Sequence, residues 1–150
     1  MLGQSEEETM KRKASVQWQG DLKTGKGTVS TESGVLKEVP YSFTKRFGEE
    51  KGSNPEELAA AAHASCFTMA VSAELGKANL VATQLATNCT ITLENVGGSW
   101  NITESHLELR ARVPGASEDA FRKATEAAET GCPISKLFKT RITLDAKLEG

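Results

Sequence analysis

The 150-residue chain has little of several features that define common protein classes. Its 18 Lys and Arg stand against 20 Asp and Glu, so it lacks the basic surplus with which proteins bind nucleic acids. No run approaches the roughly 18 consecutive apolar residues of a membrane span, and the polar N-terminus lacks the apolar core of a secretory signal. We therefore expect a cytoplasmic protein, without nucleic-acid or membrane partners.

Cysteine and histidine are also scarce, with three and two residues. Three thiols cannot all pair within one chain, so a disulfide framework is a poor explanation of the fold. No C-x-x-C motif occurs, and only His63 and His106 could supply imidazole, so the usual ligands of a zinc site are missing. The glycines around Lys26 lack the spacing of a phosphate-binding loop. We expect no cofactor and no metal, and the open question is what the thiols do.

The composition is that of an ordinary folded domain, with 38% apolar and 25% charged residues. Residues 1–12 are predicted to form a flexible lead-in, and residues 13–150 a single domain, because no repeat or linker divides them. Alternation of apolar and polar residues predicts an N-terminal meander of three antiparallel strands. These strands are expected at residues 14–20, 28–31 and 35–44, the last interrupted at Pro40.

A long helix is predicted next. Asn54 is a suitable N-cap and Pro55 suits the first helical position, and two acidic residues then face the positive end of the helix dipole. The helix should run to about Leu75 and end at Gly76. Its middle, residues 58–71, is small and apolar nearly all round, with many alanines. Such a helix is typically central, buried on most sides or packed against a partner subunit.

The second half of the chain is predicted to hold two strands, two helices and a last strand. They are expected at residues 85–93, 100–113, 117–130, 134–139 and 141–146, with a turn at Gly97-Gly98 between the strands. One face of the strand at residues 100–113 should be buried, with Leu107, Leu109, Ala111 and Val113. One stripe of the helix at residues 117–130 should also be buried, with Phe121, Ala124 and Ala128. The resulting order, βββ-α-ββ-αα-β, is an α+β fold.

The three cysteines differ in what their neighbours allow. Cys89 lies in a predicted strand without a charged neighbour, which is typical of a structural thiol. Cys132 precedes a short helix, whose positive end favours the thiolate. Cys66 lies about eleven residues into its helix, where an apolar setting raises the thiol pKa and keeps it inert unless a cation arrives from a loop or another subunit. Local features alone therefore favour Cys132, and segment 45–48 is the nearest source of a cation for Cys66.

Two other uses of the long helix are open. His63 precedes Cys66 by three residues and shares its helix face, so the two could form the pair of a small cysteine hydrolase. Alternatively, the helix of small residues merely forms the core of a non-catalytic dimer.

Several motifs together resemble OsmC (osmotically inducible protein C), a family related to the organic hydroperoxide resistance (Ohr) proteins. The motifs are Gly34-Val35-Leu36, Arg46-Phe47, residues 54–58, residues 61–67 and residues 131–135. The similarity covers about residues 13–148, and the two cysteine motifs together are its most specific part. The surroundings of His63 and Arg46 are more similar to the OsmC branch than to the Ohr branch.

The resemblance implies a thiol peroxidase that reduces organic hydroperoxides, and also hydrogen peroxide, in oxidative or osmotic stress defence. It implies that Cys66 attacks the peroxide, that Cys132 resolves the resulting sulfenic acid as a disulfide, that Arg46 is the activating cation and that Glu56 orients this arginine. It further implies an OsmC/Ohr-like fold, an intertwined homodimer with active sites at the subunit interface, and an external dithiol as reductant.

The spacing of Glu56 and Cys66 bears on this arrangement. Ten residues on a continuous helix span about 15 Å along the axis, so one arginine of the same chain would be badly stretched between both side chains. We therefore expect the Arg46–Glu56 pair that serves a given Cys66 to come from the partner subunit.

Overall fold

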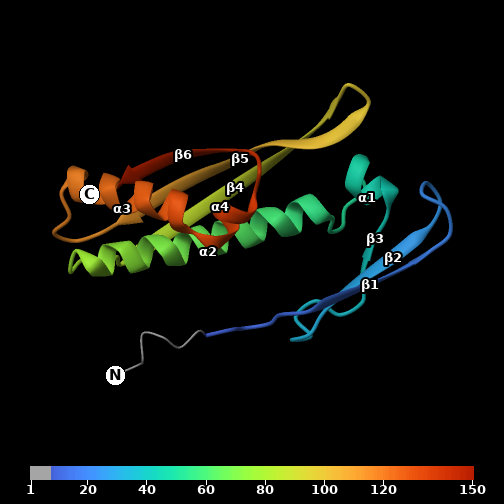
Figure 1. The fold of residues 1–150 in the computed structure, drawn as a ribbon, viewed down its shortest axis with the longest axis horizontal. Helices are drawn as coiled ribbons and strands as arrows, with labels where there is room; N and C mark the ends of the chain where they lie inside the picture. The colour runs from blue at the N-terminus through green and yellow to red at the C-terminus, as the bar shows by residue number, and fades with distance from the viewer. Residues whose placement is uncertain (1–7) are drawn as a thin grey trace. The chain divides into compact units, whose positions relative to one another are not determined.

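The computed structural model describes residues 8–150, which form two compact units that meet in sequence between Asn54 and Pro55 (Figure 1). Of the predicted lead-in, residues 1–12, residues 1–7 lie outside the described part of the chain, and residues 8–12 are exposed. The expectation of a single domain over residues 13–150 stays a prediction.

The first unit is a small antiparallel sheet followed by a short helix. Its strands pair in the order β1 (Ala14–Gln19), β2 (Lys26–Thr31) and β3 (Val39–Tyr41), which confirms the predicted meander. Gly27 lies between Trp18 and Tyr41 in the register, and the two rings meet with centroids 5.5 Å apart. A Cβ atom at Gly27 would come within 2.5 Å of the tyrosine ring, so this position requires glycine.

The end of the meander differs from the expectation. The third strand covers only Val39–Tyr41, so residues 35–38, which were expected to begin it, are not strand. Helix α1 (Phe43–Phe47) begins where the strand was expected to continue to residue 44. Ser42 explains the start of this helix, because its Oγ accepts a hydrogen bond from the Lys45 backbone N–H and caps the helix. The strand-like alternation of residues 41–44 is outweighed by this cap.

The second unit places two long helices against a three-stranded sheet (Figure 1). Its elements are α2 (Pro55–Lys77), β4 (Gln84–Val96), β5 (Ser99–Arg112), α3 (Glu118–Gly131), α4 (Pro133–Leu137) and β6 (Arg141–Leu148). The strand order is β4-β5-β6, with β4 and β5 antiparallel and β5 and β6 parallel. A parallel pair needs a crossover connection, and α3 and α4 provide it. The α+β order is confirmed, with α1 as an additional short helix.

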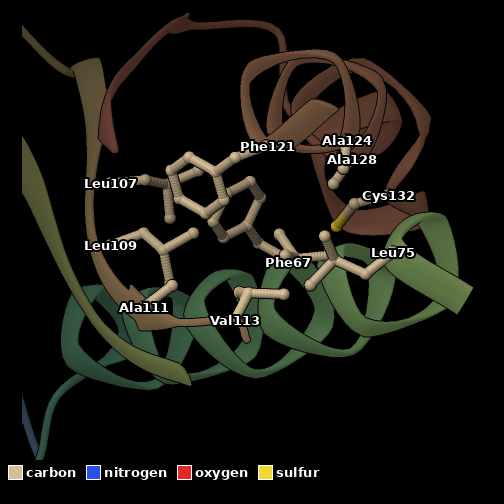
Figure 2. Close-up of a cluster of buried hydrophobic side chains, with 11 residues drawn as sticks. Phe67, Leu75, Leu107, Leu109, Ala111, Val113, Phe121, Ala124, Ala128 and Cys132 are labelled. Carbon is tan, nitrogen blue, oxygen red and sulfur yellow. The ribbon is translucent and has the colours of Figure 1, made fainter. Parts of the chain in front are cut away.

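The hairpin of β4 and β5 turns where the sequence predicts. Gly97 and Gly98 both have positive φ, 61° and 87°, as the central residues of a type I′ turn require. The predicted core faces are also confirmed, since all seven residues expected on β5, just after it and on α3 are buried. They form one cluster with Phe67, Val71, Leu75 and Cys132 (Figure 2).

Helix α2 is buried along a single stripe. His63, Phe67, Val71 and Leu75 follow one another at intervals of four residues and are fully buried. The other faces are at least partly open in this chain, and the side chain of Met69 is 76% exposed. The expectation that the helix is buried on most sides is therefore wrong for the single chain.

The predicted stop of α2 at Gly76 is also wrong. The helix continues to Lys77, and the residue with left-handed backbone is Asn79, at a φ of 59°. The N–H of Leu80 then donates to the carbonyl of Leu75 at 2.9 Å, the bond that closes a Schellman motif. Asparagine is the usual substitute for glycine in this conformation.

By length and composition α2 could cross a membrane, with a mean hydropathy of 1.3 over the best window. The core helix of a folded domain passes the same test. Here Phe67, Val71 and Leu75 are packed in the core of the second unit, so the helix is an integral part of that unit.

Candidate active site

Two of the three thiols meet at the contact between α2 and α4. The Sγ atoms of Cys66 and Cys132 lie 2.7 Å apart, although the two residues are 66 positions apart in the chain. Both thiols are free, and Cys132 is fully buried while Cys66 is partly accessible. A disulfide requires about 2.05 Å, so closing the bond moves the sulfurs by less than about 1 Å. The sulfur of Cys132 points toward α2 at the edge of the apolar cluster (Figure 2).

The surroundings of Cys66 oppose ionisation, as the sequence predicts for this position. Burial raises the pKa of the Cys66 thiol, and the hydrogen bond with Cys132 raises this pKa further, with a smaller contribution from charge repulsion between the two sulfurs. The backbone N–H of Ile134 bonds to the Cys66 sulfur and lowers the pKa in part. The amide near the start of α4 therefore serves Cys66, whereas Cys132, the N-cap residue of that helix, makes no side-chain capping bond.

The other two predicted site residues lie on α1 and α2. Arg46 is an exposed residue of α1 in the first unit, with its guanidinium carbon 5.0 Å from the centroid of the Phe47 ring. Glu56 lies in the first turn of α2, and this helix is unbroken from Glu56 to Cys66, so the two residues are about 15 Å apart along its axis. Arg46 and Cys66 belong to different units, and the roles assigned to Arg46 and Glu56 stay predictions.

Cys89 has the surroundings of a structural thiol. Its Sγ lies 3.3 Å from the Oγ of Ser105 and 4.0 Å from Nδ1 of His63. Burial raises the pKa of the Cys89 thiol, and the hydrogen bond to Ser105 offsets only part of this effect. The thiol is thus held in its protonated, unreactive form.

His63 is fully buried and uses both ring nitrogens. Nδ1 lies 2.6 Å from the Oγ of Ser105 on β5, and Nε2 lies 2.8 Å from the Oγ of Ser135 on α4. Burial lowers the pKa of His63, which favours the neutral ring, with one nitrogen donating and the other accepting. With both nitrogens engaged, His63 is not available as the base of a Cys66 hydrolase.

The two serines are the residues that the sequence reasoning missed. Ser105 lies in the predicted strand of residues 100–113, and Ser135 belongs to a motif of the resemblance without an assigned role. The signal available was that Ser135 follows Cys132 by the same three residues that separate His63 from Cys66. Within residues 8–150, no group of three or more His, Cys, Asp or Glu side chains could hold a metal ion.

Comparison with known sequences identifies relatives over nearly the whole chain. The family model of OsmC-like proteins matches residues 48–147. Peroxiredoxin OsmC of Escherichia coli K12 is 46% identical over 141 residues, which cover 94% of this chain and 99% of the relative. An organic hydroperoxide resistance protein of Xanthomonas axonopodis pv. citri is 30% identical over 98 residues, 65% of this chain and 66% of that protein.

Solved structures share the architecture at lower identity. An OsmC-like protein of unknown function from Vibrio cholerae has a TM-score of 0.73 at 18% identity, covering 92% of this chain and 99% of that one. The organic hydroperoxide resistance protein OhrB of Bacillus subtilis has a TM-score of 0.66 at 20% identity, covering 91% and 98%. These similarities concern the fold.

Proposed function

The chain belongs to the OsmC-like protein family, and on that premise we propose that it is a thiol peroxidase that reduces organic hydroperoxides, and hydrogen peroxide as well, through Cys66 and Cys132. Relatives named peroxiredoxin OsmC and organic hydroperoxide resistance protein support the reaction class. The observation that carries the assignment of residues is the 2.7 Å separation of the two sulfurs. A thiol pair so close suits the making and breaking of a disulfide.

In the first step the Cys66 thiolate attacks the outer oxygen of the hydroperoxide. A sulfur–oxygen bond forms, the oxygen–oxygen bond breaks, and the departing alkoxide takes a proton to leave as the alcohol. Cys66 becomes a sulfenic acid, oxidised by two electrons. The partial exposure of Cys66 suits this step, because substrate must reach its sulfur.

In the second step the Cys132 thiol condenses with the sulfenic acid, which releases water and forms the Cys66–Cys132 disulfide. An external dithiol then reduces this disulfide by exchange, becomes a disulfide itself and restores both thiols. The sum is one hydroperoxide and one dithiol converted to alcohol, water and oxidised dithiol.

Activation of Cys66 needs a cation, because burial raises the pKa of its thiol. We assign this role to Arg46, whose guanidinium keeps its charge at every accessible pH and can also bind the departing oxygen. Glu56 orients the arginine. Since Glu56 and Cys66 are about 15 Å apart along α2, we assign the Arg46–Glu56 pair to the partner subunit of a homodimer.

The open faces of α2 support a second subunit, since a helix of this composition is rarely left half exposed. We place the protein in the cytoplasm, where thiols are kept reduced and dithiol reductants are available.

Thiol counting after oxidation tests the function. Reduced protein is treated with one equivalent of tert-butyl hydroperoxide, remaining thiols are counted and disulfides are mapped. We expect two of the three thiols to be lost as a Cys66–Cys132 bond, Cys66→Ser to lose none, and Cys89→Ala to behave as the wild type.

Other outcomes contradict the proposal. Three surviving thiols in the wild-type protein would indicate a non-catalytic member of the fold, and a Cys66–Cys89 bond would show that Cys132 is not the resolving thiol.

A further inference from the structure

Helix α4 carries Cys132 at its start but is too short to hold this residue in place by itself. It has five residues, and isolated helices shorter than about 12 residues are marginal in water. One side of it is open, because the side chain of Leu137 is 70% exposed. Cys132 is also the C-cap of α3, where its N–H donates to the carbonyl of Ala128 at 3.0 Å, so its backbone is held from that side. The contacts on the inner side of α4 therefore bear on how Cys132 is directed toward Cys66.

His63 of α2 contacts both α4 and the residue that follows it. Its Nε2 bonds to Ser135 at 2.8 Å, and its ring meets the Phe138 ring edge-on with centroids 5.0 Å apart. On its other side, Nδ1 bonds to Ser105 of β5 at 2.6 Å. The buried chain Ser105–His63–Ser135 thus joins the sheet, α2 and α4.

Two side-chain contacts join α2 to Ser135 of α4 and to Cys132, its N-cap residue, beside the bond from the Ile134 backbone N–H to the Cys66 sulfur. His63 pairs with Ser135 and Cys66 pairs with Cys132, three residues apart on each element and in opposite directions. His63 and Cys66 share a face of α2. The carbonyl of Cys132 accepts from the Lys136 N–H at 3.1 Å, so one turn of helix links Cys132 to Ser135, and fixing one contact favours the other.

We propose that the Ser105–His63–Ser135 chain positions Cys132 for resolution, so that the Cys66 sulfenic acid forms a disulfide before a second hydroperoxide oxidises it. That competing reaction converts the sulfenic acid to sulfinic acid and the hydroperoxide to alcohol, which ends turnover. The three residues act through Cys132 and are positioning residues. The peroxide part of this inference rests on the proposed function, whereas the control of disulfide formation does not.

The first test measures the Cys66–Cys132 disulfide in glutathione redox buffers, which needs no peroxidase activity. Ser135→Ala should lower the effective concentration of the thiol pair about five- to tenfold, the effect of one lost hydrogen bond. This change corresponds to about 20–30 mV in the reduction potential. Ser135→Thr keeps the hydroxyl and should recover most of the wild-type value.

A matched pair of variants at His63 separates the two ring nitrogens. His63→Gln places an amide at the position of Nε2 and His63→Asn at that of Nδ1, and both lose the ring contact with Phe138. The asparagine variant should show the larger loss. Thr87→Val is the control, because it removes a 2.6 Å hydrogen bond between β4 and Thr68 of α2 without touching α4.

The second test adds increasing tert-butyl hydroperoxide and measures the ratio of disulfide to Cys66 sulfinic acid by intact mass. Ser135→Ala and His63→Asn should overoxidise at about five- to tenfold lower peroxide, with the rate of the first oxidation unchanged. If both variants stay within twofold of the wild type and of Thr87→Val in glutathione, the inference is wrong. A shift in glutathione without peroxide consumption by the wild type would instead refute the proposed function alone.

Discussion

At the scale of single residues, burial shifts the pKa values of Cys66 and His63 in opposite directions. Burial disfavours the charged form of either group, so it raises the pKa of the Cys66 thiol and lowers that of His63. A buried neutral histidine between two serines suits a structural link. A half-buried, protonated thiol does not suit a nucleophile, which is why the proposed mechanism requires Arg46.

The lowered pKa of His63 predicts a pH dependence of stability. Below the ordinary histidine pKa of about 6.5 the unfolded chain binds a proton that the folded chain does not, so the free energy of unfolding falls as the pH drops from 6.5 toward the folded-state pKa. The slope from one proton is at most about 1.4 kcal/mol per pH unit.

Urea unfolding of the reduced protein between pH 5 and 7.5 measures this dependence. The His63→Gln variant should have a flatter profile below pH 6.5, and Thr87→Val should keep the wild-type slope. Equal slopes in His63→Gln and the wild type would mean that His63 is protonated in the folded state.

At the scale of elements, local rules predicted most of the secondary structure. They failed where two neighbouring residues or patterns favoured different boundaries. The start of α2, the Gly97-Gly98 turn and the buried stripe of α3 follow directly from capping, turn and periodicity rules. The end of α2 does not, because both Gly76 and Asn79 are acceptable stops and the choice depends on the Schellman bond of Leu80. Helix α1 was missed because the cap at Ser42 outweighed strand-like alternation.

The position of this stop predicts opposite effects of two alanine substitutions. Gly76 lies inside α2, and a Cβ there meets no atom within 4 Å, so Gly76→Ala should raise the free energy of unfolding by about 0.5–1 kcal/mol. Asn79→Ala should lower it by about 1 kcal/mol, because alanine resists left-handed backbone, while Asn79→Gly should be nearly neutral. Chemical denaturation checks all three, and reversed signs would place the stop at Gly76.

At the scale of the whole molecule, the sequence predicted the α+β order but not the site. The pairing of Cys66 with Cys132 came from the resemblance, because periodicity and dipole arguments alone favoured Cys132 as the reactive thiol. The Ser105–His63–Ser135 chain could not be predicted, since it depends on the antiparallel approach of α2 and α4, which are far apart in sequence. The sequence pattern also could not predict that α2 is buried along one stripe only, because its small apolar residues lie on nearly all of its faces.

The assignment of Arg46 to the partner subunit predicts complementation between two inactive chains. Arg46→Ala and Cys66→Ser homodimers should each lose peroxidase activity, by about 100-fold or more for the arginine variant. A mixed dimer combines an intact Cys66 on one chain with an intact Arg46 on the other, and should recover about half of the activity of a wild-type dimer.

Co-expression with two affinity tags isolates the mixed dimer for a peroxide-consumption assay. No recovery in the mixed dimer would place Arg46 and Cys66 of one site on the same chain.

The separation of Cys66 and Cys132 by 66 positions in the chain gives the redox cycle a thermodynamic consequence for the fold. A cross-link over a loop of this length removes unfolded-state entropy worth about 4 kcal/mol at 25 °C. Oxidation by peroxide therefore makes the second unit harder to unfold, and reduction by the dithiol loosens it again. Each turnover carries the protein between a less and a more heat-resistant form, so its melting temperature reports how many molecules are waiting for reductant.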